Sequence, residues 1–233
     1  AVAAQALFYP LPNQAGDSCT HANNYFADPK LISKEKTALG RVDFRISDKD
    51  SLFARYAYYQ NFTNNGNLGY GPLYYRNDTL QNYDAMISET HTFSSSLLNS
   101  IRFAILRSDF PFQAVTAGQD YAAKIGLPGV SAAVAPIFSN GLTALNGTIG
   151  FRASTTIELL DDITKTFGSH TLHAGFDGRF VEGYNNQSGN ASGSYSFSAN
   201  QTAQGSDTAI VTGTGSQYAS FLSGAVGGAS LQL

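Results

Sequence analysis

Few residues in this chain have the types and spacing that catalysis or metal binding requires. Gly16-Asp17-Ser18-Cys19 resembles the loop around a serine-protease nucleophile, but the glycines needed after Ser18 are missing and no motif supplies His or Asp partners. His170 and His173 are three residues apart, which in a strand turns their side chains to opposite faces. We therefore expect a turn at the first segment, and no chelated metal at the second.

Three further segments are better explained by local structure than by chemistry. Asp48-Lys49-Asp50 lacks the Gly and terminal Glu of a calcium loop, so it reads as a turn. Asp161-Asp162 lies in an expected strand, where neighbouring side chains diverge. The glycine-rich run 66–71 is followed by neither a helix nor a basic residue, which argues against a phosphate loop. The sequence thus predicts no catalytic residue, no metal ligand and no cofactor, and we expect no enzyme activity.

Charged residues make up only 13% of the 233 residues, against roughly 25% in soluble domains. No run of about 18 apolar residues exists that could form a transmembrane helix. This combination fits a membrane protein built from strands, because alternation disperses its apolar residues. It also fits a secreted or fibrous β protein. The net charge of −3 gives no indication of nucleic-acid binding.

The segments that the sequence predicts as strands form three pairs of long runs. Short turns join each pair at Asp48–Asp50, Ser94–Ser96 and Gly168–Ser169, and long polar loops separate the pairs. Short turns at one end and long loops at the other are typical of an outer-membrane β-barrel, whereas a soluble sandwich turns every 8–12 residues. The expected strands are Ala38–Ser47, Ser51–Asn61, Tyr83–Phe93, Leu97–Arg107, Ile157–Phe167 and His170–Glu182.

Period-two alternation gives most of these runs an apolar and a polar face. The polar residues would line a lumen or brace a plug, or else form a solvated sheet face with cross-strand ion pairs. The candidate lipid-facing residues are Val42, Phe44, Ile46, Ile101, Phe103, Ile105, Leu172, Phe176 and Phe180. The candidate lumen-facing residues are Arg41, Asp43, Arg45, Arg55, Arg102, Asp177 and Arg179.

Two strands break the alternation. Ile87 shares its expected face with Glu89 and His91, and in the run 157–167 the isoleucines share theirs with Asp161 and Lys165. A β-bulge could re-phase either strand. Alternatively, these faces meet protein or water rather than lipid.

The chain divides into three regions. Residues 1–36 are an irregular lead-in with a short helix at Ala3–Leu7, residues 37–182 hold the hairpins, and residues 183–233 are loop-rich with short strands. Aromatic residues gather near the strand ends, which suits either the girdles of a membrane barrel or the ordinary preference of Tyr and Phe for strands. We also expect a helical turn at Tyr121–Ile125, a short strand at Gly193–Ser198, and a short helix or strand at Gln217–Leu222.

Several segments, taken in order, resemble a known family. They are Leu7–Asn13 followed by Asn23–Tyr25, Gly40–Asp43 with Ser47–Tyr56, Thr90–Ser94 with Leu97–Asn99 and Arg102, Phe167–Gly175, and Ser196–Phe197 with Ala219–Gly224. Together they resemble an internal segment of the barrel of Oar-like TonB-dependent outer-membrane receptors. The chain departs from that family in extent, because it shows no plug domain and only six to eight of the strands that such a barrel contains.

The resemblance implies an all-β fold, an antiparallel meander belonging to a large transmembrane β-barrel in a bacterial outer membrane. It implies TonB-driven uptake of a bulky ligand, with outer-membrane lipid and the remainder of the barrel, or other chains covering the sheet edges, as partners. A second class stays open, an extracellular structural or adhesive β protein that assembles through its sheet edges and Tyr/Asn-rich loops. A soluble β-domain enzyme is the third and weakest alternative.

Overall fold

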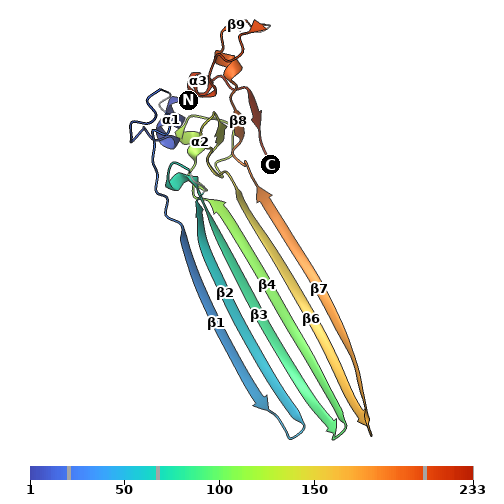
Figure 1. Cartoon of the computed structure of the whole chain (residues 1–233). Coiled ribbons are helices and arrows are strands. Elements are labelled where there is room, and N and C mark those ends of the chain that lie inside the picture. The colour runs from blue at the N-terminus through green and yellow to red at the C-terminus, as the bar shows by residue number, and fades with distance from the viewer. Residues whose placement is uncertain (20–21, 67–68, 207–208, 233) are drawn as a thin grey trace.

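The computed structural model describes residues 1–19, 22–66, 69–206 and 209–232. Six long strands form one antiparallel sheet in the order β1-β2-β3-β4-β6-β7, and neither outer edge pairs with another described strand. Figure 1 shows the strands side by side, with hairpin turns at one end and the helices and both termini at the other. The strands are β1 (Ile32–Arg45), β2 (Asp50–Gly66), β3 (Tyr75–Ser94), β4 (Leu97–Ala114), β6 (Ile149–Phe167) and β7 (His170–Ser188).

The three expected hairpins are confirmed, and their turns are as short as the sequence indicates. Gly168 and Ser169 connect β6 to β7, and Gly168 adopts a φ of 57°, a left-handed conformation that glycine reaches at little cost. In the first turn, the Ser47 hydroxyl accepts hydrogen bonds from the backbone N–H groups of Lys49 (3.0 Å) and Asp50 (3.1 Å). Local side-chain chemistry therefore fixes the hairpin ends.

The strands are longer than expected at the end away from these turns. They span 14–20 residues, beyond the roughly 9–11 needed to cross a bilayer. The expected loops 62–82 and 108–156 are therefore shorter, because β3 begins at Tyr75, β4 continues to Ala114 and β6 begins at Ile149. Polar Asn, Thr and Gln residues continue the ladder there, for example Asn77 opposite Gln113. The loop-end parts of these strands have a composition that is typical of loops, so the sequence did not indicate that they continue the sheet.

The remaining elements gather beyond the loop end of the sheet in a unit that we call the cap. Its helices are α1 (Val2–Phe8), α2 (Tyr121–Lys124) and α3 (Gln217–Ser223), with the 3₁₀ turns η1 (Pro72–Tyr74) and η2 (Ala199–Thr202). The short strands β5 (Ile137–Ser139), β8 (Ser194–Ser196) and β11 (Gly228–Ser230) form a small sheet, and β9 (Gly205–Ser206) pairs with β10 (Ala209–Ile210). The weak elements expected in this part of the sequence are confirmed.

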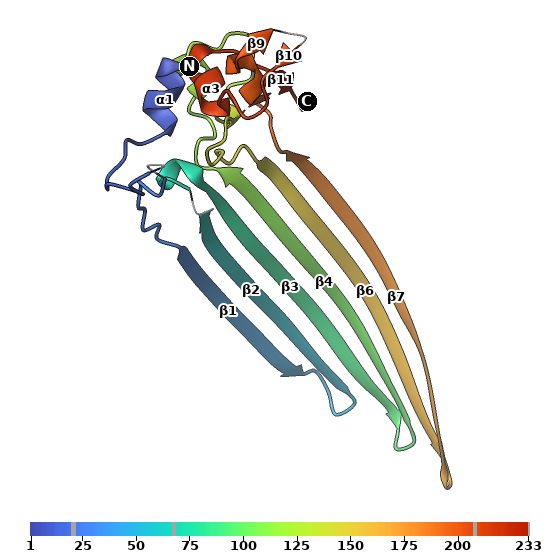
Figure 2. The same ribbon diagram turned by 45° about the horizontal axis from the view of Figure 1, so that its top comes forward.

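The cap holds the buried hydrophobic cluster of the described chain. Phe8, Tyr74, Phe138, Phe197 and Phe221 lie at its centre and are at most 7% exposed. Tyr74 donates a hydrogen bond to the carbonyl oxygen of Phe8 (2.8 Å). The N-terminal helix thereby packs against segments from the middle and the end of the chain, as the gathered elements in Figure 2 show. Among the described residues, no helix is long and apolar enough to cross a membrane.

Candidate functional site

The strand register gathers the candidate lipid-facing residues on one side of the sheet, which we call the apolar face. Residues directly opposite one another in an antiparallel pair project to the same side. Phe44 pairs with Leu52, and Ile87 pairs with Phe103. Ile46 is an exception, because β1 ends at Arg45 and Ile46 lies in the turn that follows. One row crosses the whole sheet and contains Val42, Ala54, Ile87, Phe103, Leu159 and Gly178.

Large apolar side chains on this face remain open to the surroundings. Phe44 is 60% exposed on one edge strand and Phe176 is 61% exposed on the other, while Phe103 in the middle of the sheet is 41% exposed. No described segment packs over them. A contiguous apolar surface of this kind marks a contact with lipid or with another protein.

Aromatic rings border the apolar band of this face on both sides, near the middle of the strands and near the short turns. Toward the loops, Tyr58 pairs with Tyr83 across β2 and β3, and their ring centroids are 5.3 Å apart. Toward the short turns, the ring of Phe93 contacts His91 at 4.3 Å, and Phe167 ends β6 on the same face. Two such girdles around an apolar band are characteristic of barrels that face lipid.

The candidate lumen-facing residues lie together on the opposite side, which we call the polar face. Arg41 pairs with Arg55, and alternation brings Asp43, Arg45 and Arg179 to the same side. One row crosses the sheet through Asp43, Phe53, Ser88, Arg102, Leu160 and Asp177. The register therefore places the two candidate sets on opposite sides of the sheet, apart from Ile46, while the assignment of these sides to lipid and to a lumen stays a prediction.

Ion pairs link neighbouring strands on the polar face. Arg55 contacts Asp84 at 2.8 Å between β2 and β3, and both side chains are about one-third exposed. Arg179 contacts Glu158 on β6 at 3.0 Å and Asp177 on its own strand at 3.1 Å. The Nε atoms of Arg55 and Arg102 are buried and have no hydrogen-bond partner among the residues described. Arginines and carboxylates therefore alternate on this face, and two buried arginine Nε atoms keep no partner among the described residues.

Arg41 shows how one guanidinium group combines two contacts on this face. It reaches Asp43 at 2.6 Å and lies over the ring of Phe53, 4.2 Å from the centroid. The ring face attracts the cation, and the carboxylate fixes its orientation. The edge strand β1 is thus tied to β2 by side chains as well as by the backbone ladder.

The two irregular strands keep an unbroken register, so no bulge re-phases them at the charged positions. In β3 the only irregularity falls between Thr92 and Ser94, beyond Glu89 and His91. In β6, Asp161 pairs with Phe176 and Lys165 pairs with Leu172. These four ionisable side chains therefore lie on the apolar face.

The register also brings together a group that sequence reasoning missed. Asp50 begins β2 and pairs with His91 on β3, and Glu89 lies two residues from His91 on the same face. The sequence contains no motif for this group, because its members come from two hairpins and meet only through the pairing of β2 with β3. The polar interruption of the apolar pattern at Glu89 and His91 was the available signal.

The other segments considered for chemistry do not converge. His170 pairs with Phe167 and His173 with Thr164, which places the two imidazoles on opposite faces as expected. In the exposed N-terminal turn, an Asp17 carboxylate oxygen accepts a hydrogen bond from the backbone N–H of Cys19 (3.0 Å). Asp48 is exposed and contacts Arg45 at 2.9 Å. The glycine-rich run 66–71 includes residues 67 and 68, which lie outside the described part of the chain.

The cap presents a tyrosine-lined hollow of about 270 Å³ away from the sheet. Tyr25 donates a hydrogen bond to the carbonyl oxygen of Tyr70 (2.9 Å), and the rings of Tyr9 and Tyr70 meet edge to face at 6.3 Å. Burial raises the pKa of Tyr9 to about 12, against the effect of a hydrogen bond with Asn140. Neutral phenols and amides around this hollow suit hydrogen bonding and stacking with a polar ligand.

Comparison with known proteins gives one family match. The family model described as an outer membrane beta barrel domain matches residues 1–232, which is nearly the whole chain. No curated protein matches the chain. The match agrees with the antiparallel hairpins, the two-faced strands and the aromatic girdles of the sheet.

Proposed function

We propose that this chain, which belongs to the outer membrane beta barrel domain family, forms wall strands and outer loops of a TonB-dependent channel for a bulky ligand. Family membership places the protein in the outer membrane. The two-faced sheet carries the rest of the proposal: the apolar face contacts lipid and the polar face lines the lumen. The resemblance to Oar-like receptors supports TonB as the energy source.

The open edges of the sheet support a barrel larger than these six strands. Both β1 and β7 present exposed residues along nearly their whole length. Even the smallest outer-membrane barrels contain eight strands, and a lone edge promotes pairing with another chain. In the proposed barrel, further strands pair with both edges.

The cap and the polar face have complementary roles in this proposal. The tyrosine-lined hollow lies at the loop end, where loops held by a rigid scaffold commonly bind ligands. Arg41, Arg55 and Arg179 place guanidinium groups, each paired with a carboxylate, on the face that would line the lumen. A polar ligand or a plug domain would meet charged groups of both signs there.

Uptake by cells that produce the intact protein tests the function. The probes are fluorescent oligopeptides and oligosaccharides of graded size, compared in hosts with and without functional TonB. The proposal expects at least one probe to accumulate only when TonB is active. Equal accumulation in both hosts would contradict TonB dependence.

An adhesive role is the second candidate, and the exposed edge of β7 favours it. If the protein is an adhesin, cells that produce it should aggregate whether or not TonB functions, and no probe should enter them. Aggregation without uptake would therefore favour adhesion over transport.

A further inference from the structure

Five polar residues on the apolar face lie close together, and we call them the polar island: Asp50, Glu89, His91, Asn99 and Asp161. Glu89 pairs with Leu52 and Ile101, and Asp161 pairs with Ile101 and Phe176, so apolar neighbours flank both carboxylates. Toward the loops, the next row of the face is formed by Ile87, Phe103 and Leu159. The island therefore lies at the turn end of the band that the proposed function assigns to lipid, because Asp50 is the first residue of β2.

Hydrogen bonds within the island leave one carboxylate unpaired. His91 Nδ1 shares a hydrogen bond with Asp50 Oδ1, and Asn99 donates to Asp161 Oδ1 at 2.6 Å. Glu89 has no hydrogen bond or ion pair among the described residues, although it is half-buried. Ionisable residues on a membrane-facing surface are costly and usually have a partner or a function. A cation bound at Glu89 would neutralise this carboxylate, and the other described side chains form no ion pair with it.

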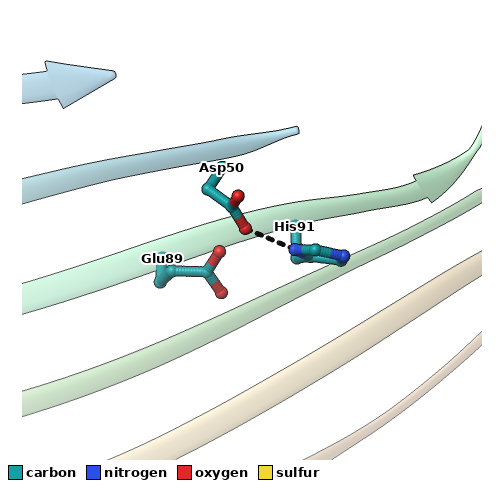
Figure 3. A group of neighbouring side chains, drawn as sticks. All are labelled: Asp50, Glu89 and His91. Carbon is teal, nitrogen blue, oxygen red and sulfur yellow. Dashed lines mark hydrogen bonds and ion pairs between the residues drawn. The ribbon is translucent and has the colours of Figure 1, made fainter. Parts of the chain in front are cut away.

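Asp50, Glu89 and His91 converge in the manner of a ligand set. One ligand atom from each residue lies within 4.8 Å of the other two. Figure 3 shows the Glu89 carboxylate extending toward the Asp50–His91 pair, from the same strand as His91 and across from Asp50. Small rotations of these side chains would bring all three atoms to the roughly 2.0–2.2 Å at which Zn²⁺ is bound by imidazole and carboxylate.

We propose that Asp50, Glu89 and His91 form a divalent transition-metal site, of which Zn²⁺ is the representative ion. One imidazole nitrogen and two carboxylates supply three ligands, and a fourth position stays open. The metal takes the place of the proton that His91 and Asp50 share, and it neutralises Glu89. Two carboxylates and one neutral imidazole around a divalent cation give a site with no net charge, which suits an apolar surface.

Neighbouring groups hold two of the ligands in place. The Ser47 hydroxyl donates a hydrogen bond to Asp50 Oδ2, and the ring of Phe93 lies 4.3 Å from the imidazole of His91. Outer contacts of this kind orient metal ligands. Because Asp50 belongs to β2 while Glu89 and His91 belong to β3, the metal would join the first two hairpins near their short turns.

Zn²⁺ titration of the intact protein, purified from outer membranes into detergent and stripped with a chelator, tests this site. Competition with a chromophoric chelator should give one tight Zn²⁺ per chain. Loss of an outer contact commonly weakens metal binding about 10- to 100-fold, so His91→Ala should cost at least about 100-fold. Glu89→Gln, which keeps the shape of the side chain, should weaken binding about 10-fold or more.

His170→Ala is the matched control, because His170 lies on the same face near a short turn but outside the island. It should bind Zn²⁺ like the wild type. Equal losses in His91→Ala and His170→Ala, or wild-type binding no tighter than that of His91→Ala, would overturn the site. Heat-modifiable migration on gels checks that each variant has folded.

Co²⁺ provides a readout that needs no variant. Bound to the wild-type protein, it should show the intense visible absorption of a low-coordinate nitrogen and oxygen site. The weak spectrum of hydrated Co²⁺ would contradict the proposal. Neither outcome depends on TonB, so the metal site and the transport function can fail separately.

Discussion

The cap and the long sheet arrange their large apolar side chains in opposite ways. In the cap, Phe221 is 1% exposed and packs against Phe197 at 5.2 Å between ring centroids. In the sheet, Phe176 is 61% exposed and no described segment covers it. The cap is built like a water-soluble core, whereas the sheet leaves apolar area that only a second solvent or a partner can cover. One chain therefore combines a region suited to water with a region suited to apolar surroundings.

The largest effect is expected from removing a central cap ring. Phe221→Ala should destabilise the cap by about 3–5 kcal/mol, because it deletes a buried aromatic side chain. Phe176→Ala, the same change on the apolar face, should leave the cap unaffected. Limited proteolysis measures the cap, and heat-modifiable migration measures the barrel. If Phe221→Ala abolished barrel assembly, the separation of the two regions would be wrong.

The next effect concerns two neighbouring aliphatic residues on opposite faces of β4. Ile105 lies on the apolar face and is 37% exposed, whereas Leu106 lies on the polar face opposite Asp84 and is 45% exposed. Ile105→Arg should cost about 2–4 kcal/mol in a detergent- or lipid-folding assay, the range for Arg in contact with lipid. Leu106→Arg should cost much less. Equal costs would mean that the two faces meet the same solvent.

Alkaline pH should loosen the cap before it affects the sheet. The pKa of Tyr9 is raised from 10.0 to about 12 by burial, and burial also raises the pKa of Tyr74. A phenol whose pKa is higher in the folded state contributes stability fully below pH 10, and this contribution is lost as the pH rises toward 12. In Tyr9→Phe, which lacks this phenol, the stability of the cap should fall less steeply with pH than in the wild type. Limited proteolysis of the cap across this pH range measures the slope, and a slope equal to that of the wild type would contradict the prediction.

The smallest effect is expected on the polar face. Arg179→Ala removes the contacts with Glu158 and Asp177, but the Arg179 side chain is 59% exposed. Because water screens such pairs, the free energy of unfolding, measured with urea, should fall by at most about 1 kcal/mol. A loss of several kcal/mol would indicate that this face is dry and packed rather than open to water.

The sequence alone predicted the hairpins, their turns and the two faces because these depend on local information. Alternation along one strand assigns Phe103 and Arg102 to opposite sides without knowledge of any partner. The strand ends at Tyr75 and Ala114 could not be predicted in this way, since polar residues enter a ladder only when an adjacent strand is already there. The grouping of Asp50 with Glu89 and His91 depends on register between hairpins, which no single segment encodes.

The environment of two adjacent positions on β4 tests most directly whether the two faces of the sheet meet different surroundings. Spin labels are placed at Phe103→Cys and Ala104→Cys in a Cys19→Ser background, with the intact protein in lipid bilayers. We expect the label at position 103 to be relaxed by oxygen dissolved in lipid and the label at position 104 by a water-soluble nickel complex. Equal access of both labels to the nickel complex, or the reverse pattern, would contradict a wall with one face toward lipid and one toward the lumen.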